Sequence, residues 1–221
     1  MSAPPDPLRG SVTERLAEQG ENRLDLCRGH FLHAVRDAVR LPDGTVGTRE
    51  YVIHPGAVMV VALLDEQHVV LEKQYRYPMG RVMIEFPAGK LDPGETSLAC
   101  AQRELREETG YAASEWAYAG VLHPVVSYST EHIDVWFARG LSLGARHLDA
   151  GEFLEVFIAS VQDLADWTRQ GMVTDAKTLV GLLWLQNVAH SGWSLQWQAA
   201  DSVMRAQPAA PWQPSVLGGQ S

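Results

Sequence analysis

Gly89-Lys90-Leu91-Asp92-Pro93-Gly94-Glu95, followed after seven further residues by Arg103-Glu104-Leu105-Arg106-Glu107-Glu108-Thr109-Gly110-Tyr111, is the stretch that decides the fold. Pro93-Gly94 marks a loop, and a helix is predicted over about residues 96–109. Gly110 suits the position just after a helix end, where a left-handed backbone is common. The stretch therefore predicts a glycine-bearing loop that leads into a helix.

The predicted helix carries three glutamates on one side. Glu104 and Glu108 lie one turn apart on the same face, and Glu107 lies beside them. The repulsion between like charges at this spacing costs about a few tenths of a kcal/mol, and Arg103 can relieve part of it by reaching Glu107. Three converging carboxylates suit Mg²⁺, which takes oxygen ligands and keeps several waters. A metal held there can bind diphosphate oxygens and position a nucleophilic water.

A solvated helix face is the alternative explanation, and it is the usual one for an isolated acidic cluster. Here the cluster does not stand alone, because Glu95 ends a loop in which Gly89 and Gly94 allow the chain to fold back on the helix. Gly110 then ends the helix. The fixed spacing of these residues favours a functional site.

The whole pattern resembles the signature GX5EX7REUXEEXGU of the Nudix hydrolases. Tyr111 takes the final position, where the family has an aliphatic residue, and its ring can still pack. The matching residues are Gly89, Glu95, Arg103, Glu104, Leu105, Glu107, Glu108 and Gly110. The resemblance implies an α/β/α sandwich that hydrolyses a nucleoside diphosphate linked to another moiety, with Mg²⁺ or Mn²⁺ as cofactor.

The same resemblance assigns roles to individual residues. Glu104 and Glu108 are implied to be the main metal ligands, and Glu107 a further ligand that also belongs to the catalytic set. Arg103 is implied to be an orienting partner in catalysis. Glu95 and the backbone carbonyl of Ala88 are implied to shape the site, with Ala88 among the metal ligands.

Beyond the motif, residues 31–188 resemble the ADP-ribose pyrophosphatases, which implies hydrolysis of ADP-ribose to AMP and ribose 5-phosphate. Arg49 and Glu50 match the strand that contributes to adenine recognition in those enzymes, and a surface Arg–Glu pair is the alternative interpretation. Arg76 matches a phosphate-binding arginine, whose planar fork suits two phosphate oxygens. Glu85 leads directly into the motif and joins the predicted substrate-binding residues.

One departure from that group concerns a loop after the motif. Val126 and Ser127 occupy positions where ADP-ribose pyrophosphatases usually carry Pro-Gly. The sugar specificity is therefore left open, with GDP-mannose or another ADP-sugar as alternative substrates. A Nudix-like sensor that binds a nucleotide without hydrolysing it is a further alternative, but it predicts loss of the motif glutamates.

The general base that deprotonates the attacking water is not fixed by the motif. Glu131 and Glu152 are two candidates outside the motif helix, and Asp149 is a third. Glu152 matches an acidic loop that supplies a base or a further metal ligand in the relatives. The sequence leaves the choice open.

The composition limits the partners. The chain has 221 residues and a formal net charge of −9, which disfavours nucleic acid as a partner. Two cysteines in no CxxC pattern fit a reducing compartment. No signal peptide or membrane-spanning run is apparent, so a cytoplasmic protein without membrane contact is expected. The relatives imply a homodimer that acts on a small-molecule nucleoside diphosphate sugar.

Strand and helix patterns alternate outside the motif and predict an α/β (α+β) fold, a Nudix-type α/β/α sandwich with a mixed β-sheet. An N-terminal β-hairpin is added to it. Strands are expected at residues 31–39, 49–54, 57–64, 69–75, 117–122, 133–138 and 153–158, and helices at 161–167, capped by Ser160, and 175–188. The expected organisation is a flexible N-terminus (1–20), an N-terminal β elaboration for dimerisation (21–56), the Nudix domain (57–206) and a flexible tail (207–221).

Overall fold

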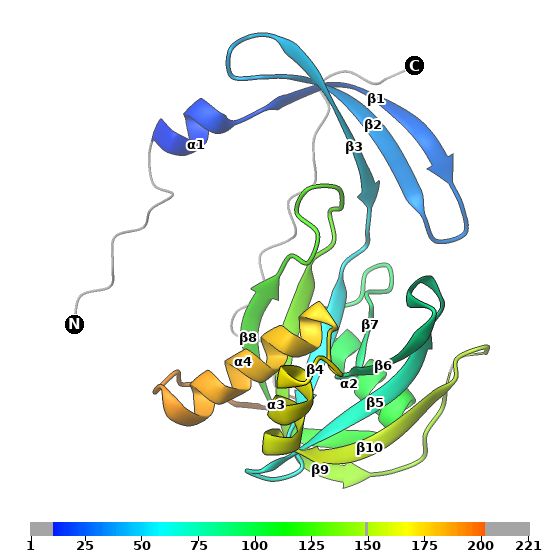
Figure 1. Ribbon diagram of the computed structural model, residues 1–221, viewed down its shortest axis with the longest axis vertical. Coiled ribbons are helices and arrows are strands. Elements are labelled where there is room, and N and C mark those ends of the chain that lie inside the picture. The colour runs from blue at the N-terminus through cyan, green and yellow to red at the C-terminus, as the bar shows by residue number, and fades with distance from the viewer. Residues whose placement is uncertain (1–10, 149, 202–221) are drawn as a thin grey trace. The chain divides into compact units, whose positions relative to one another are not determined.

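The computed structural model describes residues 11–148 and 150–201 (Figure 1). Within these residues the chain forms two compact units. Of the described residues, the first unit comprises 11–54 and 125–130, and the second comprises 55–124, 131–148 and 150–201. Residues 1–10, the tail from residue 207 and Asp149, on which expectations were stated, lie outside the described residues.

The first unit is built on a three-stranded antiparallel sheet in the order β1-β2-β3, drawn in blue to cyan in Figure 1. Its elements are α1 (Ser11–Leu16), β1 (Gln19–Arg28), β2 (His33–Arg40) and β3 (Val46–Ile53). The sequence predicted two of the three strands. Within the stretch 1–20 that was expected to be flexible, residues 11–16 form α1 and residues 19–20 begin β1. The side chains of β1 are mostly exposed, so this strand lacks the apolar alternation that sequence analysis relies on.

The buried face of the first unit comes from β2. Val35, Asp37 and Val39 alternate with more exposed residues and are at most 6% exposed. The segment 125–130 adds to the edge of β3, where Val52 donates to the carbonyl of Tyr128 at 2.9 Å and accepts from Thr130 at 3.0 Å. This unit therefore joins residues far apart in the sequence.

The second unit contains a mixed five-stranded sheet in the order β11-β8-β9-β4-β7. The central strand β4 (Ala57–Ala62) is buried along its whole length, as its continuous apolar run predicts. It pairs in parallel with β9 (Ile133–Leu143) and antiparallel with β7 (Ala88–Lys90). On the far side of β9 follow β8 (Tyr111–Leu122) and the edge strand β11 (Gln198–Ala199), and β7 forms the opposite edge.

A second sheet of three antiparallel strands, β10-β5-β6, completes the strand layer. Its members are β5 (His68–Arg76), β6 (Arg81–Glu85) and β10 (Leu154–Ser160). A short 3₁₀ helix, Tyr77–Met79, joins β5 to β6 and ends at Gly80, whose φ of 63° is left-handed. The end of β6 leads through Pro87 into β7 and so into the motif.

Three capped helices complete the second unit: α2 (Ser97–Thr109), α3 (Val161–Arg169) and α4 (Ala176–His190). Their N-caps Thr96, Ser160 and Asp175 each accept a hydrogen bond from the backbone three residues on. Gly110 ends α2 with a φ of 78°. These bounds agree with the predicted helices within about two residues. None of the described helices is both long and apolar enough to cross a membrane.

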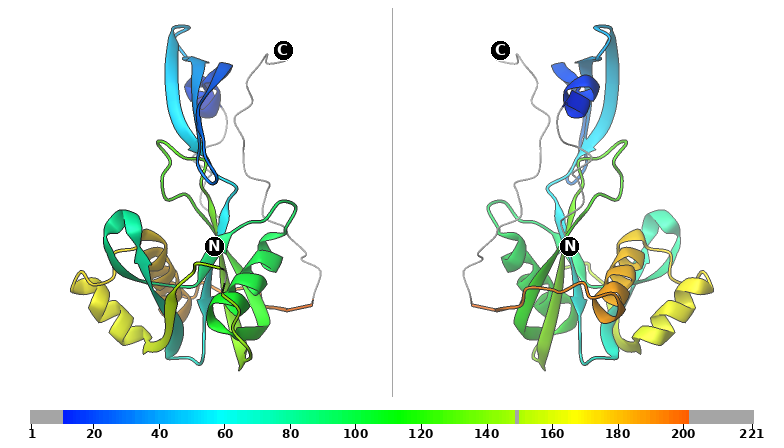
Figure 2. Two further views of the ribbon diagram at one scale, coloured as in Figure 1. Left: turned by 90° about the vertical axis from the view of Figure 1, so that its right-hand side faces the viewer. Right: turned by 90° about the vertical axis from the view of Figure 1, so that its left-hand side faces the viewer.

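The helices cover both faces of the central sheet. Met59 and Val61 of β4 pack in the cluster that contains Leu164 of α3 and Leu182 of α4. The alternate residues of β4 pack in a second cluster, which contains Leu105 of α2. Figure 2 shows α2 on the side of the sheet opposite to α3 and α4. The predicted α/β/α sandwich with a mixed sheet is confirmed.

Two strands of the central sheet extend further than the sequence predicted. β8 starts at Tyr111 and β9 continues to Leu143, and these two residues pair in register. The extension follows directly from Gly110, so that α2 and β8 are joined without a loop. The prediction missed this part of the two strands because polar residues such as Ser114 and Arg139 interrupt their apolar pattern.

Candidate active site

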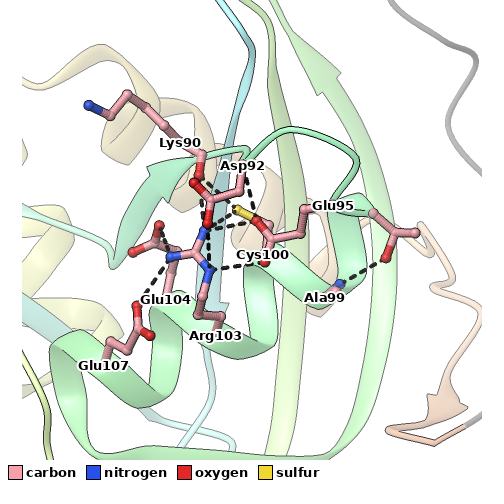
Figure 3. A network of polar contacts seen from close by, with 9 residues as sticks. Lys90, Asp92, Glu95, Ala99, Cys100, Arg103, Glu104 and Glu107 are labelled. Atoms are coloured by element: carbon pink, nitrogen blue, oxygen red, sulfur yellow. Dashed lines mark hydrogen bonds and ion pairs between the residues drawn. The ribbon is translucent and has the colours of Figure 1, made fainter. Parts of the chain in front are cut away.

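Arg103 is the centre of the polar network of the motif (Figure 3). Its Nε and Nη2 atoms donate to the two carboxylate oxygens of Glu95, both at 2.9 Å. Its Nη1 atom donates to Glu104 at 2.7 Å and to Glu107 at 3.1 Å. Nη2 also reaches the carbonyl of Lys90 at 3.1 Å. One guanidinium thus connects the loop before α2 to two glutamates of the helix.

These contacts shift the pKa values of Arg103, Glu95 and Glu104. The hydrogen bond to Glu95 and the charge of Glu104 raise the pKa of Arg103. The hydrogen bonds from Arg103 hold the pKa of Glu95 below its usual value. Burial raises the pKa of Glu104, and Arg103 opposes that effect. The network is therefore a charged, hydrogen-bonded clasp between loop and helix.

Gly89 on β7 allows Glu104 to lie against the strand. A Cβ at Gly89 would lie 1.9 Å from both Cδ and Oε1 of the Glu104 side chain, a distance at which atoms clash. The first residue of the motif is therefore glycine because the carboxylate of Glu104 occupies the space of a side chain.

Glu108 is the most buried acid of the motif helix, with 3% of its surface exposed. Its Oε2 atom accepts a hydrogen bond from the backbone N–H of Ala88 at 3.0 Å. Burial raises the pKa of Glu108 well above its usual value, and the charges of Glu72, Glu104 and Glu152 raise it further. Several carboxylates therefore crowd one buried region, where they need a compensating positive charge or a proton.

Glu85 is the centre of a second cluster, at the end of β6. It accepts two hydrogen bonds from Arg76, at 2.7 and 2.8 Å, and one from Lys177 of α4. Burial acts to raise the pKa of Glu85, but the bonds from Arg76 and the charge of Lys177 outweigh it and lower the pKa. Arg76 and Glu85, both predicted to bind substrate, are thus joined in one ion pair.

The two described candidates for the general base occupy different surroundings. Glu152, which precedes β10, is close enough to Glu104 and Glu108 for its charge to raise the pKa of both. Glu131 lies near Lys177 and His132, whose charges act against the rise in pKa that burial causes in Glu131. The structure therefore brings Glu152 into the neighbourhood of the motif glutamates.

Arg49 and Glu50 belong to the first unit, on β3. Arg49 donates to Glu18, with one contact at 3.0 Å, and Glu50 accepts from Arg36 at 2.7 Å. Neighbours on a strand point to opposite faces, and each of the two residues forms an ion pair with a residue other than its neighbour. Both residues line a cavity of about 760 Å³ within the first unit, together with Asp37, Tyr51 and residues 126–130.

Sequence reasoning missed two charged residues. Glu72 on β5 and Lys177 on α4 lie 36 and 69 positions from Glu108, and neither belongs to a short motif. Of the neighbouring charges, that of Glu72 raises the pKa of Glu108 most, and Lys177 is a direct partner of Glu85. The only available signal was Glu72 itself, because a glutamate directly after the apolar run 69–71 of a buried strand needs a compensating partner.

The carboxylate oxygens of the motif are the candidate ligands for a divalent metal. No three His, Cys, Asp or Glu side chains of residues 11–148 and 150–201 converge closely enough to hold an ion in their present rotamers. Glu104 is turned toward Arg103. The chemistry of the group nevertheless fits, because buried carboxylate oxygens that repel one another are suitable ligands for a hard cation such as Mg²⁺ or Mn²⁺.

An α/β/α sandwich with a loop–helix glutamate motif defines the class as a phosphoanhydride hydrolase domain. The NUDIX domain family model matches residues 53–180. The chain belongs to the Nudix family and is a Nudix hydrolase that resembles the ADP-ribose pyrophosphatases.

Three comparisons illustrate this membership. An ADP-ribose pyrophosphatase of Bacillus subtilis (strain 168) is 39% identical over 173 residues, which cover 77% of this chain and 94% of that protein. A methanol dehydrogenase activator of Bacillus methanolicus is 37% identical over 154 residues, covering 68% and 82%. The crystal structure of an ADP compounds hydrolase superposes with a TM-score of 0.71 at 22% identity, covering 79% of this chain and 96% of that one, and supports the fold.

Proposed function

We propose that the protein hydrolyses the pyrophosphate bond of ADP-ribose and releases AMP and ribose 5-phosphate. The observation that carries this proposal is the crowding of Glu104, Glu108 and Glu152 beside β7. The similarity to the ADP-ribose pyrophosphatase of Bacillus subtilis over 94% of that relative supports the choice of substrate.

The proposed metal ligands are the carboxylates of Glu104, Glu107, Glu108 and Glu152 and the carbonyl of Ala88. Mg²⁺ or Mn²⁺ bound by them would supply the positive charge that stabilises the phosphoryl oxygens and would acidify a bound water. Arg103 holds Glu104 and Glu107 in place through its bonds at 2.7 and 3.1 Å. Gly89 leaves the room that Glu104 requires.

Glu152 rather than Glu131 is also the proposed base, because a carboxylate that binds the metal through one oxygen keeps the other oxygen for the proton of the water. A general base must lie within hydrogen-bond reach of the attacking water, next to the metal ligands. The charge of Glu152 acts on both Glu104 and Glu108, whereas Glu131 interacts with Lys177.

The proposed phosphate contact is Arg76. Its pair with Glu85 uses two of the five N–H donors of the guanidinium, so three donors are left for phosphate oxygens. We propose that Arg49 and Glu50 recognise the base in the cavity of the first unit, whose Tyr51 offers an aromatic edge. A homodimer in which this unit forms the contact is part of the same proposal.

The test is product analysis with Mg²⁺ across ADP-ribose, other ADP-sugars, GDP-mannose, NADH and nucleoside triphosphates. Selective formation of AMP from ADP-ribose, lost in Glu108→Gln and kept in the surface control Glu155→Gln, is the expected result. If another compound of the panel is hydrolysed instead, the proposed substrate is wrong and the proposed metal site stands. Ligand binding without any turnover would overturn the enzymatic proposal in favour of a sensor.

A further inference from the structure

Glu72 is a buried carboxylate without a visible partner. It lies on β5, is 0% exposed, and neither of its carboxylate oxygens has a hydrogen-bond partner among the described residues. An unpaired buried charge is expensive, and native proteins rarely retain one without a reason. Glu72 therefore requires a compensating group that the side chains around it do not provide.

The neighbour across the sheet makes the requirement stronger. Glu72 pairs in register with Glu85 on β6, so that the two carboxylates project from the same face of the sheet. Glu85 has Arg76 and Lys177 as bonded cations. Burial and then the charge of Glu85 raise the pKa of Glu72 to about 8, although Lys177 and Arg76 act in the opposite direction. The two cations bond Glu85 and act on Glu72 only through their charge, and their effect does not offset burial and the repulsion from Glu85.

The alternation of β5 shows which way Glu72 points. Val70, two residues earlier on the same face, packs in the cluster that contains Leu105 of α2. Glu108 follows Leu105 by three positions, about one helical turn, and so continues the same side of α2. Glu72 and Glu108 thus extend the sides of β5 and α2 that share this cluster, and they lie close enough for the charge of Glu72 to act on Glu108.

We propose that Glu72 is a further carboxylate of the metal site, which binds the divalent cation together with Glu108 and Glu152. The inference rests on the proposed function, since it uses the same metal site. The carboxylate of Glu72 on β5 would then face those of Glu108 on α2 and of Glu152 before β10. A cation between them compensates Glu72 and Glu108 at once, whereas a protonated carboxyl with a structural role is the competing explanation.

Metal binding without substrate tests the proposal directly. Mn²⁺ is titrated calorimetrically into the full chain and into Glu72→Gln, which keeps the size of the side chain and removes its charge. We expect the Kd for Mn²⁺ to rise roughly 10- to 100-fold, as for other changes close to a metal site. The control Glu155→Gln, an exposed carboxylate opposite Lys73 on the neighbouring strand, should bind Mn²⁺ like the unchanged chain. An unaltered affinity in Glu72→Gln would overturn the proposal.

Thermal unfolding adds a second readout. In EDTA and at a pH above the raised pKa of about 8, where Glu72 is ionised, the Tm of Glu72→Gln should be higher than that of the unchanged chain by roughly a few °C, because an uncompensated charge is removed. The rise in Tm on adding Mn²⁺ should become smaller. Glu72→Val replaces the glutamine variant if that one does not fold.

Glu108→Gln separates this inference from the proposed function. If Glu108→Gln loses Mn²⁺ binding while Glu72→Gln retains it, the metal site holds and the role of Glu72 is refuted. If the unchanged chain itself binds no Mn²⁺ and shows no rise in Tm, both are refuted.

Discussion

The carboxylate of Glu104 lies where a side chain at Gly89 would stand: a Cβ at residue 89 would lie 1.9 Å from Glu104 Oε1. Gly89 belongs to β7 and Glu104 to α2, so the contact sets how close the helix comes to the strand. Arg103 holds the same carboxylate from the other side at 2.7 Å. The first glycine of the motif and Glu104 therefore act together: the glycine leaves room for the carboxylate, and Arg103 holds the carboxylate there.

Gly89→Ala should displace Glu104 and lower kcat/KM roughly 100-fold, as a misplacement of about 1 Å can do. The measurement is steady-state hydrolysis of ADP-ribose together with the Kd for Mn²⁺. Gly144→Ala is the matched control, because the added carbon would meet its nearest neighbour at an ordinary 3.6 Å. Equal activities of the two variants would contradict the proposed role of Gly89.

Arg103→Lys keeps a positive charge but loses the planar fork that binds Glu95, Glu104 and Glu107 at once. We expect kcat/KM to fall roughly 10- to 100-fold, typical of a group that orients metal ligands. Circular dichroism should show a retained fold. Arg106→Lys, an exposed position on the same helix, should change neither property.

The motif helix could be predicted because its information is local. The spacing of Glu104, Glu107 and Glu108, and the stop at Gly110, depend only on helix geometry and on the backbone freedom of glycine. The helix observed over Ser97–Thr109 and its left-handed end at Gly110 agree with that prediction.

The remaining parts of the site depend on contacts that no local pattern contains. Lys177 reaches Glu85 from 92 positions along the chain, and Glu72 comes near Glu108 only because β5 and α2 contribute to the same apolar cluster. The exposed strand β1 has no apolar alternation to reveal it. Tertiary packing therefore decides which charged residues complete the site.

Asp37 is a buried anchor of the first unit and gives a prediction about stability. It accepts two hydrogen bonds from Arg23 at 2.9 Å and one from Tyr51 at 2.6 Å. Asp37→Asn should weaken the unit by about 2 kcal/mol, the value for hydrogen bonds to a charged group. Faster hydrogen–deuterium exchange in β1–β3 of the full chain measures the effect. Asp25→Asn, at an exposed site of the same sheet, should alter exchange much less.

The same anchor should depend on pH. The hydrogen bonds from Arg23 lower the pKa of Asp37 in the folded state, against the opposing effect of burial. The stabilising contribution of Asp37 is therefore complete above the ordinary carboxyl pKa of about 4 and is lost as the pH falls through the lowered value. The difference in exchange between the unchanged chain and Asp37→Asn should shrink below about pH 4. A difference that grows on acidification would contradict the assignment.

Arg76 gives a prediction about substrate binding, because it combines a structural pair with free donors. Two N–H groups bind Glu85, and the others are proposed to bind a phosphate of the substrate. Lysine cannot serve both partners, so Arg76→Lys should raise KM for ADP-ribose roughly 10- to 100-fold and change kcat less. Arg81→Lys is the control, since Arg81 pairs in register with Arg76 but donates to Thr174. If Arg76→Lys lowers kcat and leaves KM unchanged, Arg76 acts in the chemical step and not in binding phosphate.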